Sequence, residues 1–332
     1  MNGSPTSTTE RASVTLPPGF RPESLVVDDA RGVAYLGSLA DGRILAVDLA
    51  TGRQRTVRTG AAGRQAGGLR LDGHGRLVVA GGFAGDASVV DPDSGAELAT
   101  YQLARTAPGV VADVVVHAGA AWFTDYFLPV LHRVPLPADG TLPGPDEVTQ
   151  VPLTGEVVYT DGFNLGGITT TADGAALLCV QADTGLLFRI DPGTGSAVTV
   201  DLGTDLLAHG DGITRIGSAL HIPLGLDDVV AVVQLDDAGT RGTVVERFGS
   251  PSFDVPTAVA HHEGLLWVVN SRMTTEPESD TPYALTVLEW PRTPSARDAV
   301  RSVLPPGAPG PATGGPGAAP GALVTTPLDR AG

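Results

Sequence analysis

The amino-acid sequence predicts an all-β protein, and three observations carry this prediction. Glycine and proline are abundant, at 44 and 27 of the 332 residues, whereas aromatic residues make up only 5%. Short apolar segments alternate with turn residues along most of the chain. One short sequence pattern also recurs six times, at intervals of 44 to 54 residues. Many short strands joined by tight turns fit this composition, and a bundle of long helices does not.

The recurring pattern is a small or acidic residue followed by a short apolar strand. Its six copies start at Glu23, Gly67, Ala112, Gly166, Asp211 and Thr257. A repeat of about 45 residues that carries several strands is the signature of a β-propeller, in which each blade buries its faces against its neighbours. Six copies therefore predict a six-bladed β-propeller of four-stranded antiparallel blades.

Each copy continues through a second and a third strand, and several copies show a fourth. The predicted second strands are Val33–Gly37, Leu77–Gly81, Ala121–Asp125, Ala176–Val180, Ala219–Pro223 and Leu265–Asn270. Third strands are predicted at Arg43–Asp48, Ala87–Asp91 and Leu187–Asp191, and fourth strands at Glu97–Leu103, Ala197–Leu202 and Gly242–Phe248. The third strands run into turns that start with aspartate and end with glycine, which suit local side-chain bonds and positive φ.

The two ends of the chain complete this organisation. The sixth copy holds three strand candidates within Pro256–Trp290 but no fourth before the chain becomes rich in proline and glycine. The apolar segment Ala12–Leu16 is predicted to supply that strand, which closes the ring and removes an open sheet edge. We therefore predict a propeller over residues 12–292, a disordered start over 1–11, and a largely disordered tail rich in proline, glycine and alanine over 293–332.

Charge and cysteine content exclude several classes of function. The formal net charge is −16 and all 21 basic residues are arginine, which argues against nucleic acid or an anionic membrane as the main partner. Cys179 is the only cysteine, so neither internal disulfides nor a zinc site of several thiolates is expected. No apolar run reaches the length of a signal peptide or a membrane span. We expect a soluble, cytoplasmic monomer that acts on a small organic substrate.

The repeat also indicates a candidate site. In a propeller the innermost strand of each blade lines the central channel, so the first residues of the six copies form a ring around one point. Two members of this ring, Glu23 and Asp211, are acidic, and the other four are small and neutral. A buried charge is costly without a partner. These two carboxyls are therefore the main candidates for metal binding or for acid and base catalysis.

At these positions the sequence resembles the senescence marker protein, regucalcin and gluconolactonase family of six-bladed propellers, over about Pro22–Pro291. Glu23 matches the family glutamate of the first blade, and Asp211 matches the aspartate of the fifth. Asp113 matches an aspartate that follows the third-blade ligand, and runs such as Phe253–Pro256 look like a bacterial branch. The resemblance implies one divalent cation, often calcium, and hydrolysis of sugar lactones and related esters.

The sequence also departs from this family. The resemblance implies asparagine ligands from the third and fourth blades, but Ala112 and Gly166 stand at those positions. Asn164, two residues upstream of Gly166, is the nearest candidate to replace one of them if no bulge turns its side chain away. Two carboxylates and Asn164 make a weak site for a cation that wants six to eight oxygen ligands. Two alternatives therefore remain for this site. Either it binds calcium through Glu23, Asn164 and Asp211, or it binds no metal.

Two mechanisms follow. With a cation, the metal polarises a lactone carbonyl and lowers the pKa of a bound water, whose proton Asp211 or Glu23 accepts. Without one, two facing carboxylates cannot both ionise cheaply, so the pKa of one rises and the pair donates and accepts a proton at neutral pH. The first fits a lactonase-like hydrolase, and the second fits a metal-independent cyclase or isomerase of natural-product biosynthesis. A third alternative is a non-catalytic propeller that binds a ligand or a protein.

Further residues are candidates for supporting roles. His209 precedes Asp211 closely enough to tune the pair or to act as a base. The candidate substrate-binding residues are Asp113, Asp125, Tyr126, Asn164, Gln181, His221 and Asn270. Tyr126 and Phe127 are predicted to form an apolar wall, and the insertion Pro137–Phe163 is predicted to cover the cavity.

Overall fold

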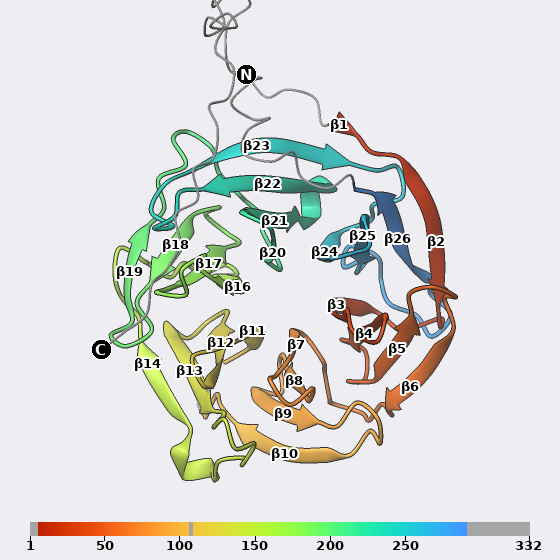
Figure 1. Ribbon diagram of the computed structural model, residues 1–332, viewed down its shortest axis with the longest axis horizontal. Coiled ribbons are helices and arrows are strands. Elements are labelled where there is room, and N and C mark those ends of the chain that lie inside the picture. The colour runs from red at the N-terminus through yellow and green to blue at the C-terminus, as the bar shows by residue number, and fades with distance from the viewer. Residues whose placement is uncertain (1–5, 106–108, 291–332) are drawn as a thin grey trace, which may run out of the picture. The chain divides into compact units, whose positions relative to one another are not determined.

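The computed structural model describes residues 6–105 and 109–290. This part of the chain forms six sheets arranged around a common axis (Figure 1). In every sheet the four main strands are antiparallel, with the first strand of the repeat innermost. The prediction of a six-bladed propeller is therefore confirmed.

The first three blades follow the chain without interruption. The first consists of β3 (Pro22–Asp28), β4 (Val33–Ser38), β5 (Ile44–Asp48) and β6 (Gln54–Arg58). The second consists of β7 (Leu69–Leu71), β8 (Leu77–Ala80), β9 (Asp86–Val90) and β10 (Glu97–Gln102). The third consists of β11 (Val111–His117), β12 (Ala120–Asp125), β13 (Val130–Pro135) and β14 (Thr149–Pro152).

The other three blades include strands from elsewhere in the chain. The fourth consists of β16 (Leu165–Thr170), β17 (Leu177–Gln181), β18 (Leu187–Ile190) and β19 (Ser196–Thr199), with β15 (Thr154–Gly155) added in parallel. The fifth consists of β20 (Thr214–Ile216), β21 (Ala219–Leu224), β22 (Val229–Leu235) and β23 (Gly242–Gly249), with β1 (Thr6–Ser7) added in parallel. The sixth consists of β24 (Pro256–His262), β25 (Leu265–Asn270), β26 (Tyr283–Glu289) and β2 (Glu10–Leu16).

Strand β2 closes the ring, as predicted. It pairs antiparallel with β26 on the outside of the sixth blade, with Leu16 opposite Tyr283 and Val14 opposite Leu285. The expected disordered start at 1–11 is wrong for its second half, because residues 6–7 form β1 and β2 begins at Glu10. Both segments pair with strands that would otherwise be edges. Residues 1–5 and the predicted tail at 293–332 lie outside the described residues.

The core lies between blades and not within them. Each of six apolar clusters combines side chains of two neighbouring blades. Tyr35 of the first blade, for example, packs in one cluster with Leu77 of the second. The second strands β12, β17 and β21 are buried along their whole length, because neighbouring blades cover both of their faces. This explains why the sequence shows them as nearly continuous apolar runs.

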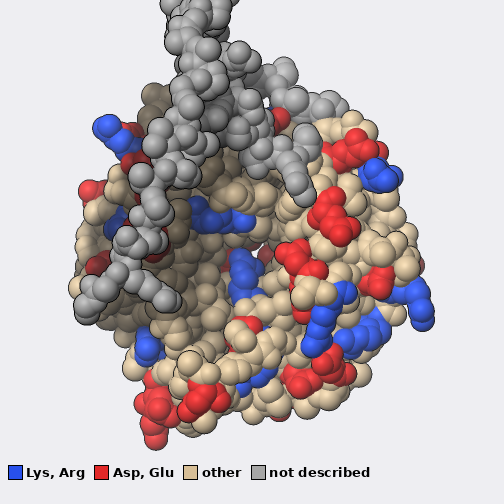
Figure 2. All heavy atoms as spheres, in the orientation of Figure 1, with Lys and Arg blue, Asp and Glu red and all other residues tan. Residues whose placement is uncertain are grey.

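The insertion after the third strand of the third blade forms β14, β15 and a 3-10 helix, η1 (Pro145–Glu147). A second 3-10 helix, η2 (Gly225–Asp227), follows β21. Within residues 6–105 and 109–290, no helix has the length and apolar character of a membrane span. Acidic side chains are spread over the face of the ring in Figure 2 and do not gather in one patch.

Candidate functional site

A cavity of about 660 Å³ opens at the end of the propeller where the inner strands begin. Five of the six ring residues line it: Glu23, Gly67, Ala112, Asp211 and Thr257. The cavity volume lies within the range of small-molecule sites. The repeat therefore predicted correctly which residues share one space, with Gly166 as the exception.

β-Bulges at the start of the inner strands set the direction of the ring residues. The pairing register shifts between Pro22 and Ser24 around Glu23, and between Pro256 and Ala258 around Thr257. A bulge turns a side chain away from the direction that regular alternation gives it. Hydrogen bonds between neighbouring blades hold these ring residues in position. The Thr257 hydroxyl donates to the carbonyl of Glu23 at 2.6 Å, and the amide of Gly212 donates to the carbonyl of Thr257 at 2.9 Å.

Glu23 and Asp211 form an acidic pair in this cavity. The Oε2 atom of Glu23 is out of contact with solvent and has no hydrogen-bond partner. Burial and the charge of Asp211 hold the pKa of Glu23 well above its usual range, although Arg21 acts in the opposite direction. Burial and the charge of Asp113 raise the pKa of Asp211 to about 7. The two carboxyls therefore hold protons to higher pH than ordinary carboxyls do, and Asp211 is close to its midpoint at neutral pH.

Asp113 and Arg70 form the floor of the cavity. Asp113 accepts hydrogen bonds from the amide of Val114 at 2.8 Å and from the amide of Ile168 in the next blade at 3.2 Å. A guanidinium nitrogen of Arg70 lies 3.6 Å from its Oδ2 atom. Sequence reasoning missed Arg70. The sequence does contain a clue to Arg70. It is the fourth residue of the second copy of the repeat, where the first copy has the apolar Val26.

Tyr126 occupies the space of the fourth ring position. A Cβ atom added to Gly166 would come within 3.2 Å of both Cε1 and Oη of Tyr126. The tyrosine ring therefore stands where a larger residue at position 166 would place its side chain, and it lines the cavity itself. Burial raises the pKa of Tyr126, and the charges of Asp211 and Glu23 raise it further. Its hydroxyl is consequently a proton-bearing donor beside the acidic pair.

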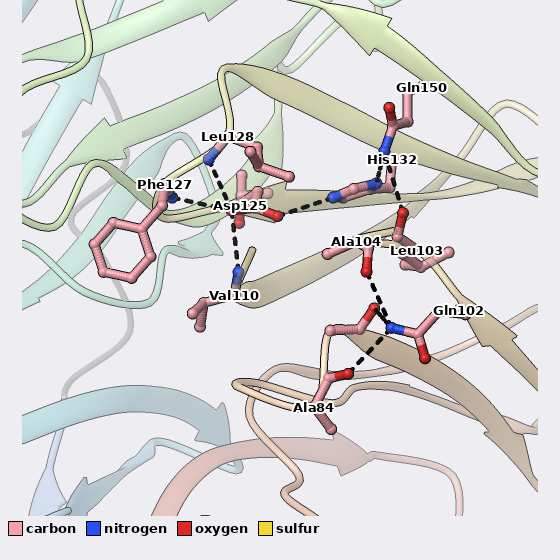
Figure 3. A network of polar contacts seen from close by, with 12 residues as sticks. Ala84, Gln102, Leu103, Ala104, Val110, Asp125, Phe127, Leu128, His132 and Gln150 are labelled. Atoms are coloured by element: carbon pink, nitrogen blue, oxygen red, sulfur yellow. Dashed lines mark hydrogen bonds and ion pairs between the residues drawn. The ribbon is translucent and has the colours of Figure 1, made fainter. Parts of the chain in front are cut away.

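Asp125 precedes Tyr126 in the chain and does not line the cavity. Figure 3 shows its carboxylate at the centre of a network. Oδ1 accepts hydrogen bonds from the amides of Val110, Phe127 and Leu128 at 2.9 to 3.1 Å. Its Oδ2 lies 3.1 Å from Nε2 of His132, and both side chains are fully buried. Asp125, predicted to bind substrate, is therefore committed to the fold.

His209 lines the cavity near its mouth. Its φ of 60° places the backbone in the left-handed region, and its Nδ1 lies 3.5 Å from Oδ1 of Asp227 in η2. The side chain is 44% exposed. The histidine thus stands at the entrance, two residues from Asp211, where it can contact a ligand.

The remaining predicted substrate-binding residues lie outside the cavity lining: Asn164, Gln181, His221 and Asn270. Asn164 bonds to its own loop and to β17, because its Oδ1 accepts from the amide of Thr160 at 2.8 Å and from Nε2 of Gln181 at 2.7 Å. His221 packs edge-on against Trp290, and Asn270 donates to the hydroxyl of Thr286 at 2.9 Å. The bulge between Leu165 and Ile168 explains why Asn164 does not follow the expected direction.

The residues present do not fit a tight calcium site. Asn164 is committed elsewhere, so Glu23 and Asp211 are the two side-chain oxygen donors left from the predicted set. Two carboxylates fall well short of the six to eight oxygen ligands that calcium takes. Among the residues that the structure describes, no group of three or more His, Cys, Asp or Glu side chains has the arrangement of a metal site.

Comparison with known proteins places the fold. No protein-family model and no curated protein matches this sequence. Regucalcin from Agrobacterium tumefaciens, a calcium-binding protein, is similar in structure, with a TM-score of 0.60, 18% identity, and coverage of 87% of this chain and 99% of that chain. A gluconolactonase from Xanthomonas campestris gives a TM-score of 0.58 and 16% identity, with coverage of 87% and 96%.

A virginiamycin B lyase from Staphylococcus aureus is also similar, with a TM-score of 0.57, 17% identity, and coverage of 77% of this chain and 81% of that chain. The expected likeness to regucalcin and gluconolactonase is therefore confirmed at the level of the fold. At these identities the likeness says nothing about the reaction, because one propeller fold carries many activities.

Proposed function

We propose that this chain is a hydrolase that opens a small cyclic ester, with Glu23 as the general acid and Asp211 as the general base. One observation carries the proposal. An unpartnered carboxyl oxygen of Glu23 lies out of contact with solvent in a cavity that it shares with Asp211. Two neighbouring buried carboxyls with raised pKa values can share one proton, and such a pair supplies both a proton donor and a proton acceptor.

The reaction balances with these groups and one water molecule. Asp211 takes a proton from the water, whose oxygen forms a bond to the carbonyl carbon of the lactone. The hydroxyl of Tyr126 donates a hydrogen bond to the carbonyl oxygen as negative charge develops there. The ring C–O bond then breaks, and Glu23 gives its proton to the leaving oxygen. Transfer of the proton from Asp211 to Glu23 restores the pair and leaves a hydroxy acid.

Substitution of each acid tests the proposal. We expect Glu23→Gln and Asp211→Asn each to lower kcat/KM for lactones at least a hundredfold, the usual contribution of a general acid or base. Asp139→Asn is the matched control, because Asp139 lies on an exposed turn and bonds only within it, and it should leave kcat/KM unchanged. Treatment with a chelator should also have no effect. Loss of activity on chelation and its recovery with calcium would instead establish a metal-assisted reaction.

A metal-independent cyclase or isomerase is the second candidate. It is favoured by the apolar side chains in the cavity lining, because a site that excludes water suppresses hydrolysis as a competing reaction. The same pair would then move a proton between two positions of one substrate. A ligand that binds equally well to wild type and to Glu23→Gln, with no turnover of any probe, would indicate a non-catalytic binding propeller.

A further inference from the structure

Apolar side chains surround the mouth of the cavity. Nine large hydrophobic residues are exposed in the part of the chain that the structure describes, and four of them line this cavity. The four are Phe83, Phe163, Leu226 and Met273, with 67%, 50%, 58% and 39% of their surface exposed. They come from four separate loops. Exposed apolar side chains gathered at one place mark a binding surface, whereas single ones are ordinary.

We call these four residues the apolar rim, and hydrogen bonds and ring contacts fix much of it in position. The side-chain amide of Gln65 donates to the carbonyl of Leu39 at 3.2 Å and accepts from the amide of Phe83 at 2.8 Å. The ring of Phe163 lies edge-on to Tyr126, with centroids 5.1 Å apart. Leu226 lies in η2, whose Gly225 amide donates to the carbonyl of His209 at 3.0 Å. A preformed surface loses little entropy when a ligand binds.

The uncharged Ser, Thr and Gln side chains on the cavity walls are already used within the protein. The hydroxyls of Ser24, Thr214 and Thr257 donate to backbone carbonyls of neighbouring blades. Gln65 uses its amide group to hold the rim. A polyhydroxylated ligand would lose water from its hydroxyls and find no free Ser, Thr or Gln side chain to replace it, which is unfavourable for each hydroxyl left without a charged partner.

The geometry points to a substrate class: a lactone that carries an alkyl or aryl substituent, with its carbonyl at the acidic pair and its substituent against the apolar rim. This inference rests on the proposed function and specifies its substrate. It separates the chain from sugar lactonases, because a sugar lactone has no apolar group to place against the rim.

Binding of a lactone series tests the inference. The probes are δ-lactones with alkyl substituents of increasing length, together with glucono-δ-lactone, bound to Asp211→Asn and measured by calorimetry. A buried CH₂ group contributes about 0.8 kcal/mol, so affinity should rise about fourfold for each carbon that reaches the rim. Glucono-δ-lactone should bind at least a hundredfold more weakly than the longest probe.

A second substitution tests whether the rise in affinity with alkyl length comes from contact with the apolar rim. Leu226→Ser, in the Asp211→Asn background, should weaken binding of the longest probe about tenfold and leave the shortest unchanged. Leu98→Ser is the matched control, because Leu98 is 44% exposed on β10 and does not line the cavity. It should change nothing.

The outcomes separate this inference from the proposed function. Affinity that is independent of chain length, or unaffected by Leu226→Ser, overturns the inference. If wild type then still hydrolyses lactones in a Glu23-dependent manner, the proposed function survives. If the alkyl lactones bind as expected but wild type never opens them, the apolar substrate class stands and the hydrolase proposal fails.

Discussion

Glu23 and Asp211 impose a cost on the folded state that depends on pH. Both have raised pKa values when folded, whereas carboxyls in an unfolded chain titrate near pH 4. The folded chain therefore holds protons that the unfolded chain releases. Their stabilising effect is complete below about pH 4 and is lost as pH rises through about 7 for Asp211, and the raised pKa of Glu23 acts in the same direction.

We expect the free energy of unfolding to fall as pH rises from about 6.5 to 8. Below this window His221 acts in the opposite direction, because burial lowers its pKa to about 4. The shift at Asp211 corresponds to at most roughly 4 kcal/mol. Urea denaturation at a series of pH values measures this, and Asp211→Asn should flatten the slope. Exposed turn aspartates with lowered pKa values act in the opposite direction but only near or below pH 4, so they do not mask the trend: Asp48, Asp91, Asp139 and Asp191. An unchanged slope in Asp211→Asn would contradict the assignment.

Gly166 leaves room for the ring of Tyr126, and this makes a second prediction. In Gly166→Ala the new Cβ would lie 3.2 Å from Cε1 and Oη of Tyr126, so the ring must move by a few tenths of an ångström. We expect a stability loss of roughly 1 kcal/mol and a fall in kcat of about tenfold. Gly73→Ala is the control, because a Cβ there meets nothing within 4 Å. Unchanged kcat in Gly166→Ala would argue against a role for Tyr126.

At the scale of strands and loops, the sequence predicts strand ends better than it predicts the directions of side chains next to bulges. The second strand Leu265–Asn270 was predicted with its exact ends, because burial on both faces gives an unbroken apolar run. Asn164 was misplaced, because the pairing of β16 with β17 contains a bulge between Leu165 and Ile168 that regular alternation along the strand does not predict. The contact between Tyr126 and Gly166 likewise forms between the third and fourth blades, so neither copy of the repeat shows it in its own sequence.

The loop after β12 depends on one buried carboxylate. Asp125 satisfies three backbone amides and His132, so its removal leaves several buried donors without partners (Figure 3). We expect Asp125→Ala to lower the free energy of unfolding by about 3 to 5 kcal/mol, measured by urea denaturation. Asp139→Ala removes a carboxylate that serves an exposed turn and should cost less than about 1 kcal/mol. Similar losses in the two variants would contradict the central role of Asp125.

At the scale of the whole propeller, the repeat determines both the fold and the site. The six starts of the repeat bring residues from Glu23 to Thr257 to the same end of the axis. The net charge of −16 is dispersed over turns and surfaces, as Figure 2 shows for one face. Glu23, Asp113 and Asp211, at the inner ends of three blades, meet in one cavity. The repeat does not mark the residues of the apolar rim, because each of them lies in a connection between strands whose sequence varies from copy to copy.

Closure of the ring by β2 can be tested by deletion of that strand. Strand β2 comes from the start of the chain and pairs with β26, which ends the propeller, so the first and last parts of the ring hold each other. Deletion of residues 1–16 would leave β26 as an open edge and remove Leu16, which is 2% exposed, from the cluster between the sixth and first blades. Each lost backbone hydrogen bond is worth about 1 kcal/mol, so we expect a loss of several kcal/mol.

The open edge of β26 should also promote association, because unpaired strands pair with other chains. Size-exclusion chromatography would then show oligomers, and the urea midpoint would fall. Deletion of residues 1–5 is the control, because it leaves β1 and β2 intact and should preserve both readouts. A chain without residues 1–16 that stayed monomeric, with an unchanged midpoint, would mean that three strands suffice for the sixth blade.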